Sequence, residues 1–493
     1  MTPLCSIQAV QPSFDVAAAR KATFQAPVWV HFGAGNIFRG YIALLQDELL
    51  NKGLSDKGVI AAESFDPAII ESVYRPYDNR TLLVTLCPDG STRLAVSASV
   101  TEALAAVPGT PDDRRLAEII EAQSLQMISF TITEKGYRGP AMKLLAGLLY
   151  RRYQAGGPPL ALVSMDNCSG NGDLLRSAAL EEAEAMGDGG FIEYLSDPSR
   201  VSFPWSMIDK ITPAPSPAVQ KTLPAGIDWT PVKTAKGTVV APFVNAEAPQ
   251  YLVIEDSFPN GRPPLEKAGV YFTGRDTVRK AERMKVTACL NPLHTALAVF
   301  GSLLRIETIS DCMKDGDLAA LVRRVGYDEG LPAVEHPGIF EPRDFLDEVV
   351  TARLVNPFLP DTPKRIAADT SQKIPFRFGE TIQSYAGRGD LSIGSLVAIP
   401  LVLAGWVRYL LEIGDDGKPL ELSPDPMLPK LKNALKDVRF GDPSTAGSAR
   451  AVFSDAGCFG CDLYAVGLGG RCEEHLAAML KGPGAVRERL RWL

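Results

Sequence analysis

The sequence predicts an α/β protein in which a parallel sheet with helices on both faces is followed by a mainly α-helical domain. In the first half of the chain, short apolar runs alternate with segments of helical periodicity, which is typical of parallel sheets. From about residue 278 onward, helical periodicity dominates. Because 493 residues are too many for one ordinary core, we expect two domains, 1–275 and 276–493.

The expected elements rest on local patterns. Apolar runs flanked by turn residues predict strands at 26–33, 58–62, 125–133 and 159–165, and a β-hairpin at 82–85 and 94–100. Helical spacing predicts helices at 37–50, 142–153, 292–304, 318–325, 343–354, 392–413, 429–436 and 473–480. Residues 206–264 are rich in proline and short strand-like runs, and we expect them to be irregular.

The composition, with 46% hydrophobic and 22% charged residues, is typical of a soluble globular protein. A net charge of −7 with mixed signs argues against a nucleic-acid partner. We find no uncharged apolar stretch of about 18 residues and no signal-peptide pattern, so we expect no membrane partner. Eight thinly spread cysteines do not predict a disulfide framework. We expect a cytoplasmic protein that is a monomer or a small homo-oligomer.

A glycine turn, GAGNIFRG at 33–40, comes directly after the first expected strand. Its first two glycines allow a close approach of a pyrophosphate to the backbone, and the amides of the following helix can donate to phosphate. The third glycine of the usual dinucleotide-binding pattern is missing, because Phe38 stands in its place, so a purely structural turn is the alternative. The residues that we assign to a dinucleotide here are Gly33, Gly35, Asn36, Ile37 and Arg39.

Two acids near the end of the second expected strand bear on the choice of cofactor. Glu63 ends this strand and Asp66 stands three residues later. A carboxylate here can accept hydrogen bonds from the adenosine ribose and would repel a 2′-phosphate. We therefore predict NAD rather than NADP, although either acid alone is equally compatible with an ordinary surface residue.

A polar segment, DNCSGNG at 166–172, comes directly after the strand expected at 159–165. Open α/β sheets bind ligands beyond the carboxyl ends of their strands, which favours a role in binding. We assign Asn167 to the cofactor and Asn171 to the reaction. The alternative is a plain loop, because Asn-Gly pairs are common in turns.

The segment KVTACLNPLH at 285–294 combines an amine, an amide and an imidazole in an apolar stretch. Apolar surroundings lower the pKa of a lysine toward neutrality, so Lys285 can act as a base. Asn291 can hold an alkoxide or carbonyl oxygen, and His294 can orient a hydroxyl. These groups suffice to oxidise an alcohol without a metal. The alternative is a buried helix start whose polar groups are caps.

Six blocks in this order resemble the polyol-specific long-chain dehydrogenases, a family that includes mannitol 2-dehydrogenase, fructuronate reductase (mannonate oxidoreductase), tagaturonate reductase and arabinitol dehydrogenase. The blocks are VHFGAGNIFRG at 30–40, DNCSGNGDLLR at 166–176, FPWSMIDKITP at 203–213, KVTACLNPLHTALAVFG at 285–301, RIAADTSQKIPFR at 365–377 and FGCDLYAVGLG at 459–469. The resemblance implies a metal-independent NAD(P) dehydrogenase with an extended Rossmann-type N-terminal domain, a helical C-terminal domain and a site between them.

The resemblance also implies roles for individual residues. Lys285 is similar to the catalytic lysine, the base in alcohol oxidation and the acid in ketone reduction. Asn291 and Asn171 are similar to the two amides that hold the reacting oxygen, and His294 to the substrate-binding histidine. Glu282 is similar to the acid that relays protons to solvent. Lys373 and Arg365 fall on positions that contact substrate hydroxyls or carboxylate.

This chain departs from the family pattern near the lysine. In the family four residues separate the lysine from the asparagine, whereas five stand between Lys285 and Asn291 here. Pro292 also replaces the usual glycine, and proline fits the first position of a helix. We expect a bulge or a helix break to absorb the extra residue. Lys280 is the nearby alternative, but it fits the motif worse.

A second constellation has the spacing of two pairs of zinc ligands: Cys458, Cys461, Cys472 and His475. The family's C-terminal pattern covers the same stretch without needing the cysteines, and free cysteines are often buried. We therefore assign no metal and keep a structural zinc as the alternative. We interpret His31 and His336 as structural.

The sequence therefore predicts an NAD-dependent oxidoreductase that interconverts a secondary alcohol and a ketone on an acyclic sugar acid or polyol. The cations Arg365, Lys373 and Arg377 suit a substrate carboxylate and favour the pair fructuronate and mannonate. Mannitol and fructose are the alternative pair. A non-catalytic nucleotide-binding regulatory protein is a more remote alternative.

Overall fold

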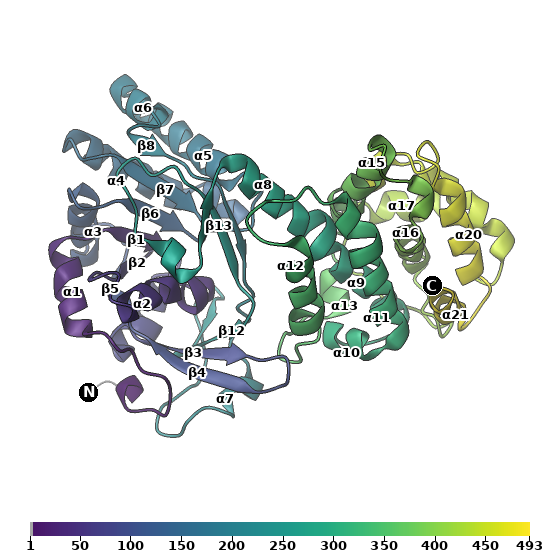
Figure 1. Cartoon of the computed structure of the whole chain (residues 1–493), viewed down its shortest axis with the longest axis horizontal. Coiled ribbons are helices and arrows are strands. Elements are labelled where there is room, and N and C mark those ends of the chain that lie inside the picture. The colour runs from purple at the N-terminus through teal and green to yellow at the C-terminus, as the bar shows by residue number, and fades with distance from the viewer. Residues whose placement is uncertain (1–2) are drawn as a thin grey trace. The chain divides into compact units, whose positions relative to one another are not determined.

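The computed structural model describes residues 3–493, and the chain divides into two compact units. The first comprises the residues up to 87 together with 91–279, and the second comprises 88–90 and 280–493. The first unit contains the sheets, whereas the second is built from helices (Figure 1). The predicted fold class, a Rossmann-type α/β part followed by a mainly helical part, is confirmed.

A six-stranded parallel sheet forms the centre of the first unit, in the order β5-β2-β1-β6-β7-β8. Its strands are β1 (Trp29–Phe32), β2 (Val59–Glu63), β5 (Val100–Ala105), β6 (Met127–Phe130), β7 (Leu160–Ser164) and β8 (Val201–Ser202). Because side chains alternate along a strand, Val30 and Phe32 join one hydrophobic cluster and Trp29 joins the other. The sheet is therefore buried on both faces, as the near-continuous apolar runs predict.

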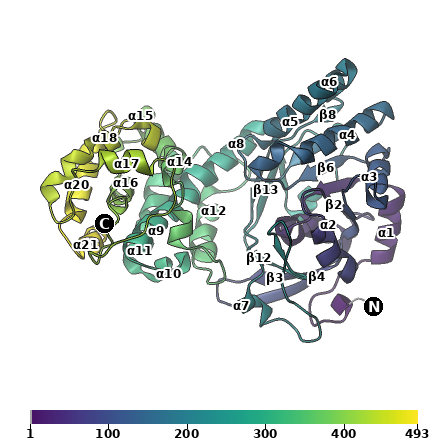
Figure 2. The same ribbon diagram turned by 180° about the vertical axis from the view of Figure 1, so that it is seen from behind.

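Helices cover both faces of this sheet (Figures 1 and 2). The cluster on one face is built with α3 (Pro111–Glu121), α4 (Pro140–Gln154), α5 (Asn171–Met186) and α6 (Gly189–Ser196). The other cluster contains residues of α2 (Ala43–Asn51) and of the smaller strands beyond residue 205. Helix α1 (Val16–Gln25) packs near β5. The sequence analysis did not predict α1, α3, α5 or α6.

The expected hairpin is present as β3 (Thr81–Leu86) and β4 (Thr92–Ser97), which pair antiparallel. Residues 206–264, expected to be irregular, contribute further strands instead. Strand β12 (Phe243–Glu247) pairs with β3, and β13 (Tyr251–Glu255) pairs with β9 (Ser206–Asp209). The remaining elements of the unit are α7 (Pro217–Gln220), β10 (Val232–Lys233), β11 (Val239–Val240) and β14 (Tyr271–Thr273). These strands are short and lie between prolines, which is why the segment was expected to be irregular.

Two buried helices, α9 (Asn291–Leu303) and α16 (Ala398–Tyr409), pack against each other in the second unit. The other helices are α10 (Ile309–Lys314), α11 (Gly316–Arg323), α12 (Pro342–Glu348), α13 (Pro363–Ile366), α14 (Thr370–Ile374), α15 (Glu380–Gly387), α17 (Leu428–Ala434), α18 (Arg450–Phe453), α19 (Ala456–Phe459), α20 (Gly469–Met479) and α21 (Ala485–Arg491). The helix expected from residue 392 begins only at Ala398, because Glu329 accepts the N–H groups of Val397, Ala398 and Ile399 at 2.6–2.7 Å.

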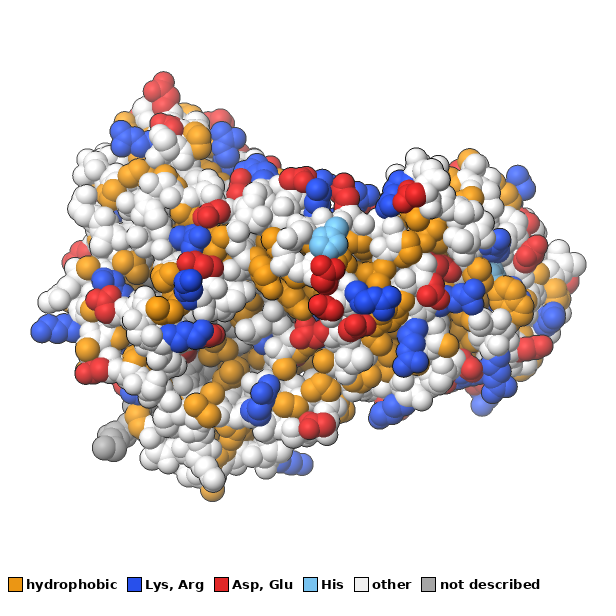
Figure 3. Space-filling model, in the orientation of Figure 1, with side chains coloured by type: hydrophobic (Ala, Val, Ile, Leu, Met, Phe, Trp, Pro, Cys, Tyr) orange, Lys and Arg blue, Asp and Glu red, His pale blue; other side chains and the backbone are white. Residues whose placement is uncertain are grey.

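The helical stretch Arg275–Leu303, which runs from α8 (Arg275–Met284) through α9, is long and apolar enough to cross a membrane by length and composition alone. Yet 78% of its most apolar window is buried within the protein, and core helices have the same composition. On the face drawn in Figure 3, acidic and basic side chains lie interspersed, in keeping with the mixed charge of the sequence.

Several helices contain π-helical turns, in which the hydrogen bond spans five residues instead of four. They lie at Phe38–Ile42, Ile70–Tyr74, Lys285–Cys289, Arg324–Gly330, Val349–Arg353 and Pro375–Gly379. Each wide turn inserts one residue into a helix and rotates the remainder of that helix by roughly 100°. The helices expected at 37–50 and 343–354 are both interrupted in this way.

Asp47 of α2 is a buried acid that costs stability at neutral pH. Its Oδ1 accepts the N–H of Ala98 at 3.0 Å, and the residue is 7% exposed. Burial raises the pKa of Asp47 from 3.8 to about 6, although hydrogen bonds from Ser97 and Ala98 act in the opposite direction. Since the pKa is higher in the folded state, stability is lost as the pH rises through this range.

We expect Asp47→Asn to raise the free energy of unfolding at pH 8 by about 1–3 kcal/mol. An asparagine keeps the acceptor for Ala98 and carries no charge, so the gain should be much smaller at pH 4 and should vanish only at lower pH, where the aspartate is protonated in both states. Denaturant unfolding of the variant and of wild type at pH 4, 6 and 8 measures the difference in the free energy of unfolding. The exposed Asp437→Asn is the matched control. An Asp47→Asn gain that is the same at all three pH values would contradict the explanation.

Candidate active site

The glycine turn extends from β1, on the edge where the parallel strands β2 and β6 also end. Gly33 has a φ of +105°, and a Cβ there would lie 2.7 Å from the carbonyl oxygen of Thr131, so the position requires glycine. A Cβ at Gly35 would meet no described atom within 4 Å beyond its chain neighbours. The turn therefore leaves open space at its backbone, which a bound pyrophosphate requires.

Gly40 provides the close contact that the sequence pattern lacks at position 38. The π-helical turn Phe38–Ile42 lies at the start of the helix, and a Cβ on Gly40 would lie 3.0 Å from Thr212 Cγ2 and 3.2 Å from Val244 Cγ2. The third glycine of a dinucleotide-binding turn normally allows this close packing between helix and strand. Here it falls two positions later than the pattern expects, so the usual spacing did not reveal it.

The carboxylate of Glu63 fastens the glycine turn to the end of β2. Its Oε2 accepts the N–H of Ala34 at 2.8 Å, and its Oε1 accepts those of Phe65 and Asp66 at 2.8 and 3.0 Å. Asp66 in turn accepts the hydroxyl of Thr234 at 2.6 Å. Both acids expected to meet the ribose thus have protein partners already. Carboxylate oxygens can accept further hydrogen bonds, so the ribose contact stays a prediction.

Arg39, expected to contact a phosphate, is 1% exposed. It donates to the carbonyl oxygen of Ala241 at 2.7 Å and to Thr81 Oγ1 at 3.2 Å, and its guanidinium lies 5.7 Å from the centre of the Tyr74 ring. Burial lowers the pKa of Arg39 to about 10, so it remains charged at neutral pH. These contacts attach the π-helical turn Phe38–Ile42 to β3 and to Ala241. The contact between Arg39 and a phosphate stays a prediction, and the burial of the guanidinium does not favour it.

The helix after the turn begins at Asn36 and Ile37, both half-buried. The amide of Asn36 donates to the carbonyl oxygen of Val239 at 3.4 Å. Its Oδ1 is buried and has no hydrogen-bond partner among residues 3–493. An orphaned acceptor beside the open space at Gly35 is compatible with a ligand that carries hydroxyl groups.

We expect Glu63→Gln to raise the Kd for NADH by about tenfold, because an amide cannot accept all three N–H groups that position the turn. Fluorescence titration with NADH measures the change. Glu71→Gln, an exposed glutamate of the same unit that pairs with Arg75, is the control and should leave the Kd within about twofold. An unaltered Kd for the Glu63 variant would show that the hydrogen bonds of Glu63 to the glycine turn do not support cofactor binding.

Asn171 begins α5 and is completely buried. Its Nδ2 donates to the backbone oxygen and the hydroxyl of Ser206, both at 3.1 Å, and lies 3.3 Å from the carbonyl oxygen of Ser164. Its Oδ1 accepts the N–H of Ser206 at 3.0 Å. The amide thus joins β7 to β9, and a substrate oxygen would have to compete with these acceptors. Asn167 lies in the preceding loop and is exposed.

In the second unit, Lys285 opens the π-helical turn that connects α8 to α9. The N–H of Leu290 donates to the carbonyl oxygen of Lys285 at 3.1 Å, across five residues. The wide turn absorbs the extra residue between Lys285 and Asn291, as the expected bulge would. Lys285 is 8% exposed, so most of its side chain is removed from water. Glu282 is half-buried, three residues earlier on α8.

The first turn of α9 carries Asn291, which is half-buried, and His294, which is 9% exposed. Nε2 of His294 lies 3.9 Å from Oδ2 of Asp361. Burial lowers the pKa of His294 to about 4; Asp361 opposes this shift, and Arg353 and Arg377 add to it. His294 is therefore neutral at physiological pH and can both donate and accept a hydrogen bond.

The structure brings the predicted cations Arg365, Lys373 and Arg377 close to His294. The carboxylate of Asp361, which faces His294, also forms an ion pair with Arg365. Burial lowers the pKa of Lys373, and Arg377 lowers it further, so these two cations lie close together. Asp361 is part of this cluster, but no sequence motif marks it, because its role depends on partners that only the folded chain brings together.

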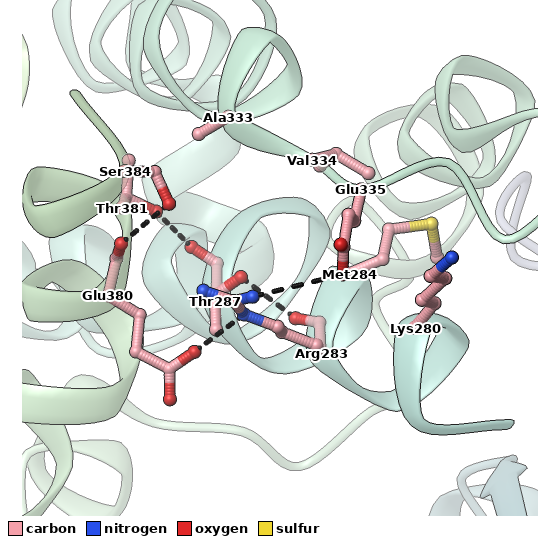
Figure 4. A pocket seen from close by; sticks show the side chains of 10 residues that line it. All are labelled: Lys280, Arg283, Met284, Thr287, Ala333, Val334, Glu335, Glu380, Thr381 and Ser384. Carbon is pink, nitrogen blue, oxygen red and sulfur yellow. Dashed lines mark hydrogen bonds and ion pairs between the residues drawn. The ribbon is translucent and has the colours of Figure 1, made fainter. Parts of the chain in front are cut away.

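A separate pocket lies on another side of the same helical stretch (Figure 4). Lys280, Arg283, Met284 and Thr287 share one helix face and line it together with residues of α15 and of the segment 333–335. Arg283 pairs with Glu380 at 2.8 Å, so its charge is already balanced. The pocket does not include Lys285, Asn291 or His294, and we assign it no chemistry.

The structure does not support the alternative of a structural zinc. Within residues 3–493, no group of three or more His, Cys, Asp or Glu side chains could hold a metal ion. Nδ1 of His475 instead accepts a hydrogen bond from Nε of Arg489 at 2.8 Å, and Cys458 and Cys472 are buried. His31 is buried between the hydroxyls of Ser129 and Thr131 at 2.7 and 2.9 Å.

The open glycine turn at the end of a parallel sheet is compatible with a nucleotide cofactor, and the buried lysine, the amide and the neutral histidine of the helical unit are groups typical of a dehydrogenase. Two family models match the chain: the mannitol dehydrogenase Rossmann domain over residues 28–267 and the mannitol dehydrogenase C-terminal domain over residues 277–462. The chain belongs to the mannitol dehydrogenase family. It is an NAD-dependent oxidoreductase that acts on CH–OH groups.

The relatives agree with this assignment, and the solved structures agree with the fold. The chain is 49% identical to D-mannonate oxidoreductase of Thermotoga maritima, over 97% of this chain and 94% of that protein. It is 29% identical to mannitol 2-dehydrogenase of Cereibacter sphaeroides, over 83% and 85% of the two chains. The fold matches a D-sorbitol dehydrogenase (TM-score 0.77, 23% identity, 95% and 94% covered) and a Pseudomonas fluorescens mannitol 2-dehydrogenase solved with NAD and D-mannitol (TM-score 0.68, 23% identity, 99% and 97% covered).

Proposed function

We propose that the enzyme interconverts D-fructuronate and D-mannonate. The observation that carries the proposal is the 49% identity, over almost the whole chain, to a protein named D-mannonate oxidoreductase. The cations beside His294 support it, because a sugar acid brings a carboxylate that positive charge can bind. When bound, NAD takes up the hydride in alcohol oxidation, and NADH returns it in ketone reduction.

In this proposal Lys285 accepts the hydroxyl proton during oxidation and returns it during reduction. Asn291 and Asn171 donate hydrogen bonds to the reacting oxygen as its charge develops. His294, which is neutral, orients a substrate hydroxyl. Glu282 passes the proton between Lys285 and solvent. To bind the reacting oxygen, the Nδ2 group of Asn171 must give up one of its present hydrogen bonds to Ser206.

The same proposal assigns the remaining contacts. Lys373 and Arg365 bind substrate hydroxyls or the carboxylate. The residues assigned to NAD are Gly33, Gly35, Asn36, Ile37, Arg39, Glu63, Asp66 and Asn167. We further propose that the enzyme is cytoplasmic and acts as a monomer or a small homo-oligomer, with the sugar acid as its small-molecule partner.

A second candidate is the oxidation of D-mannitol to D-fructose. The observation that favours it is the likeness to proteins named mannitol 2-dehydrogenase, at 29% identity. A neutral polyol would leave the cations without an anionic partner from the substrate, which is why we place this pair second.

The proposal is tested by monitoring NADH absorbance with D-fructuronate, D-tagaturonate and D-fructose, and with NADPH in place of NADH. Rapid oxidation of NADH with D-fructuronate supports it. Activity confined to D-fructose would move the enzyme to the mannitol pair. NADH binding without turnover of any of the three would overturn the substrate assignment.

We expect Lys285→Ala to lower kcat by at least about 10³-fold, because the proton then has no positioned acceptor. The Kd for NADH should change little, since the variant leaves the glycine turn intact. Steady-state kinetics and a binding titration measure the two effects. Lys280→Ala, from the same helical stretch, is the matched control and should keep most of the activity. Equal losses in both variants would contradict the assignment of Lys285 as the base.

A further inference from the structure

The three cations near His294 differ in how far the protein already balances their charge. Arg365 is 61% exposed and forms an ion pair with Asp361. The ammonium group of Lys373 donates to the carbonyl oxygen of Ala368 and lies 3.4 Å from that of Ile366. Both groups therefore have negative or partly negative atoms of the protein beside them.

Arg377 has neither a carboxylate nor a carbonyl oxygen as a hydrogen-bond partner within residues 3–493. Its Nη1 donates to Thr295 Oγ1 at 2.6 Å, and within residues 3–493 it takes part in no ion pair. A guanidinium has five N–H donors, so most of them remain available. The residue is half-buried, and this burial lowers the pKa of Arg377 to about 10, so it keeps its charge at neutral pH. A buried charge without a counter-charge is costly unless a ligand supplies one.

The position of Arg377 is fixed by the elements that carry the proposed chemistry. Thr295, its hydrogen-bond partner, is the neighbour of His294 on α9, and its hydroxyl also donates to the carbonyl oxygen of Asn291 at 3.1 Å. Arg377 lies on the π-helical turn Pro375–Gly379, which packs against the turn of Lys285. The guanidinium is therefore held beside the first turn of α9, where the reacting groups lie.

We propose that Arg377 is the specificity-determining residue of the substrate site: it binds the carboxylate of a sugar acid, whereas Arg365 and Lys373 contact substrate hydroxyls. The proposal rests on the function proposed above and deepens it. A planar guanidinium matches a carboxylate through two parallel hydrogen bonds, which a neutral hydroxymethyl group cannot form. A single residue would thus separate uronates from polyols of the same length.

The test compares Arg377→Gln and Arg377→Lys with wild type in D-fructuronate reduction. We expect Arg377→Gln to raise KM for D-fructuronate, and the Kd for D-mannonate in calorimetry, by about 100-fold, with a much smaller effect on kcat. Arg377→Lys keeps the charge but loses the two parallel N–H donors of the guanidinium, so its KM should lie between those of wild type and Arg377→Gln. The Kd for NADH and the melting temperature should stay near those of wild type. Arg343→Gln, an exposed arginine of the same unit, is the control.

D-Fructose carries a hydroxymethyl group where D-fructuronate carries the carboxylate, so the ratio of kcat/KM for the two substrates isolates the charge. Loss of this preference in Arg377→Gln supports the proposal. A KM that rises less than about threefold, or a loss confined to kcat, would overturn it. A wild-type enzyme that binds NADH but does not turn over D-fructuronate would instead overturn the proposed function. In that case an unchanged Kd for D-mannonate in the variant would overturn the proposal as well.

Discussion

The junction that carries Lys285, Asn291 and His294 depends on one hydrogen bond, from the N–H of Leu290 to the carbonyl oxygen of Lys285, which spans five residues. Helix α9 is buried along nearly its whole length, so packing fixes the direction in which Asn291 and His294 point. With five residues between the lysine and the asparagine, a regular α-helix would turn Lys285 away by roughly 100°. The π-helical turn takes up the extra residue, so Lys285 keeps the orientation relative to α9 that a four-residue spacing would give in a regular helix.

Buried charged groups in this protein mostly connect one element to another. Glu63 joins β2 to the glycine turn, and Arg39 joins the π-helical turn Phe38–Ile42 to β3 and to Ala241. Glu329 accepts the N–H groups at the start of α16. Glu63 and Glu329 are satisfied by backbone N–H groups, and Arg39 by a carbonyl oxygen and a hydroxyl, although its Nη1 has no partner within residues 3–493. Arg377 differs because one hydroxyl is its only hydrogen-bond partner within those residues. This difference, together with its place beside the first turn of α9, is why we propose Arg377 as a recognition group.

Much of the fold could be predicted because the information was local. The strands near 29–32, 59–63, 127–130 and 160–164 are buried on both faces, so their apolar runs were continuous. Strands β12 and β13 were missed because they are short runs in a proline-containing segment, with Pro242 and Pro249 on either side of β12. Gly40 was missed for a different reason: the spacing of the usual pattern assumes a regular helix, and a π-helical turn shifted the close contact.

The sequence by itself determined the class of fold, the order of the motif blocks and the chemical types available at the site, because these depend on residue identity and short-range periodicity. Only the tertiary structure decided which of those groups are free to act. Asn171 and Glu63 have their hydrogen bonds used within the protein, Arg365 is neutralised by Asp361, and Arg377 is left uncompensated. Such differences depend on partners that are distant in sequence, and hydrogen bonds and charges are balanced only when the chain has folded.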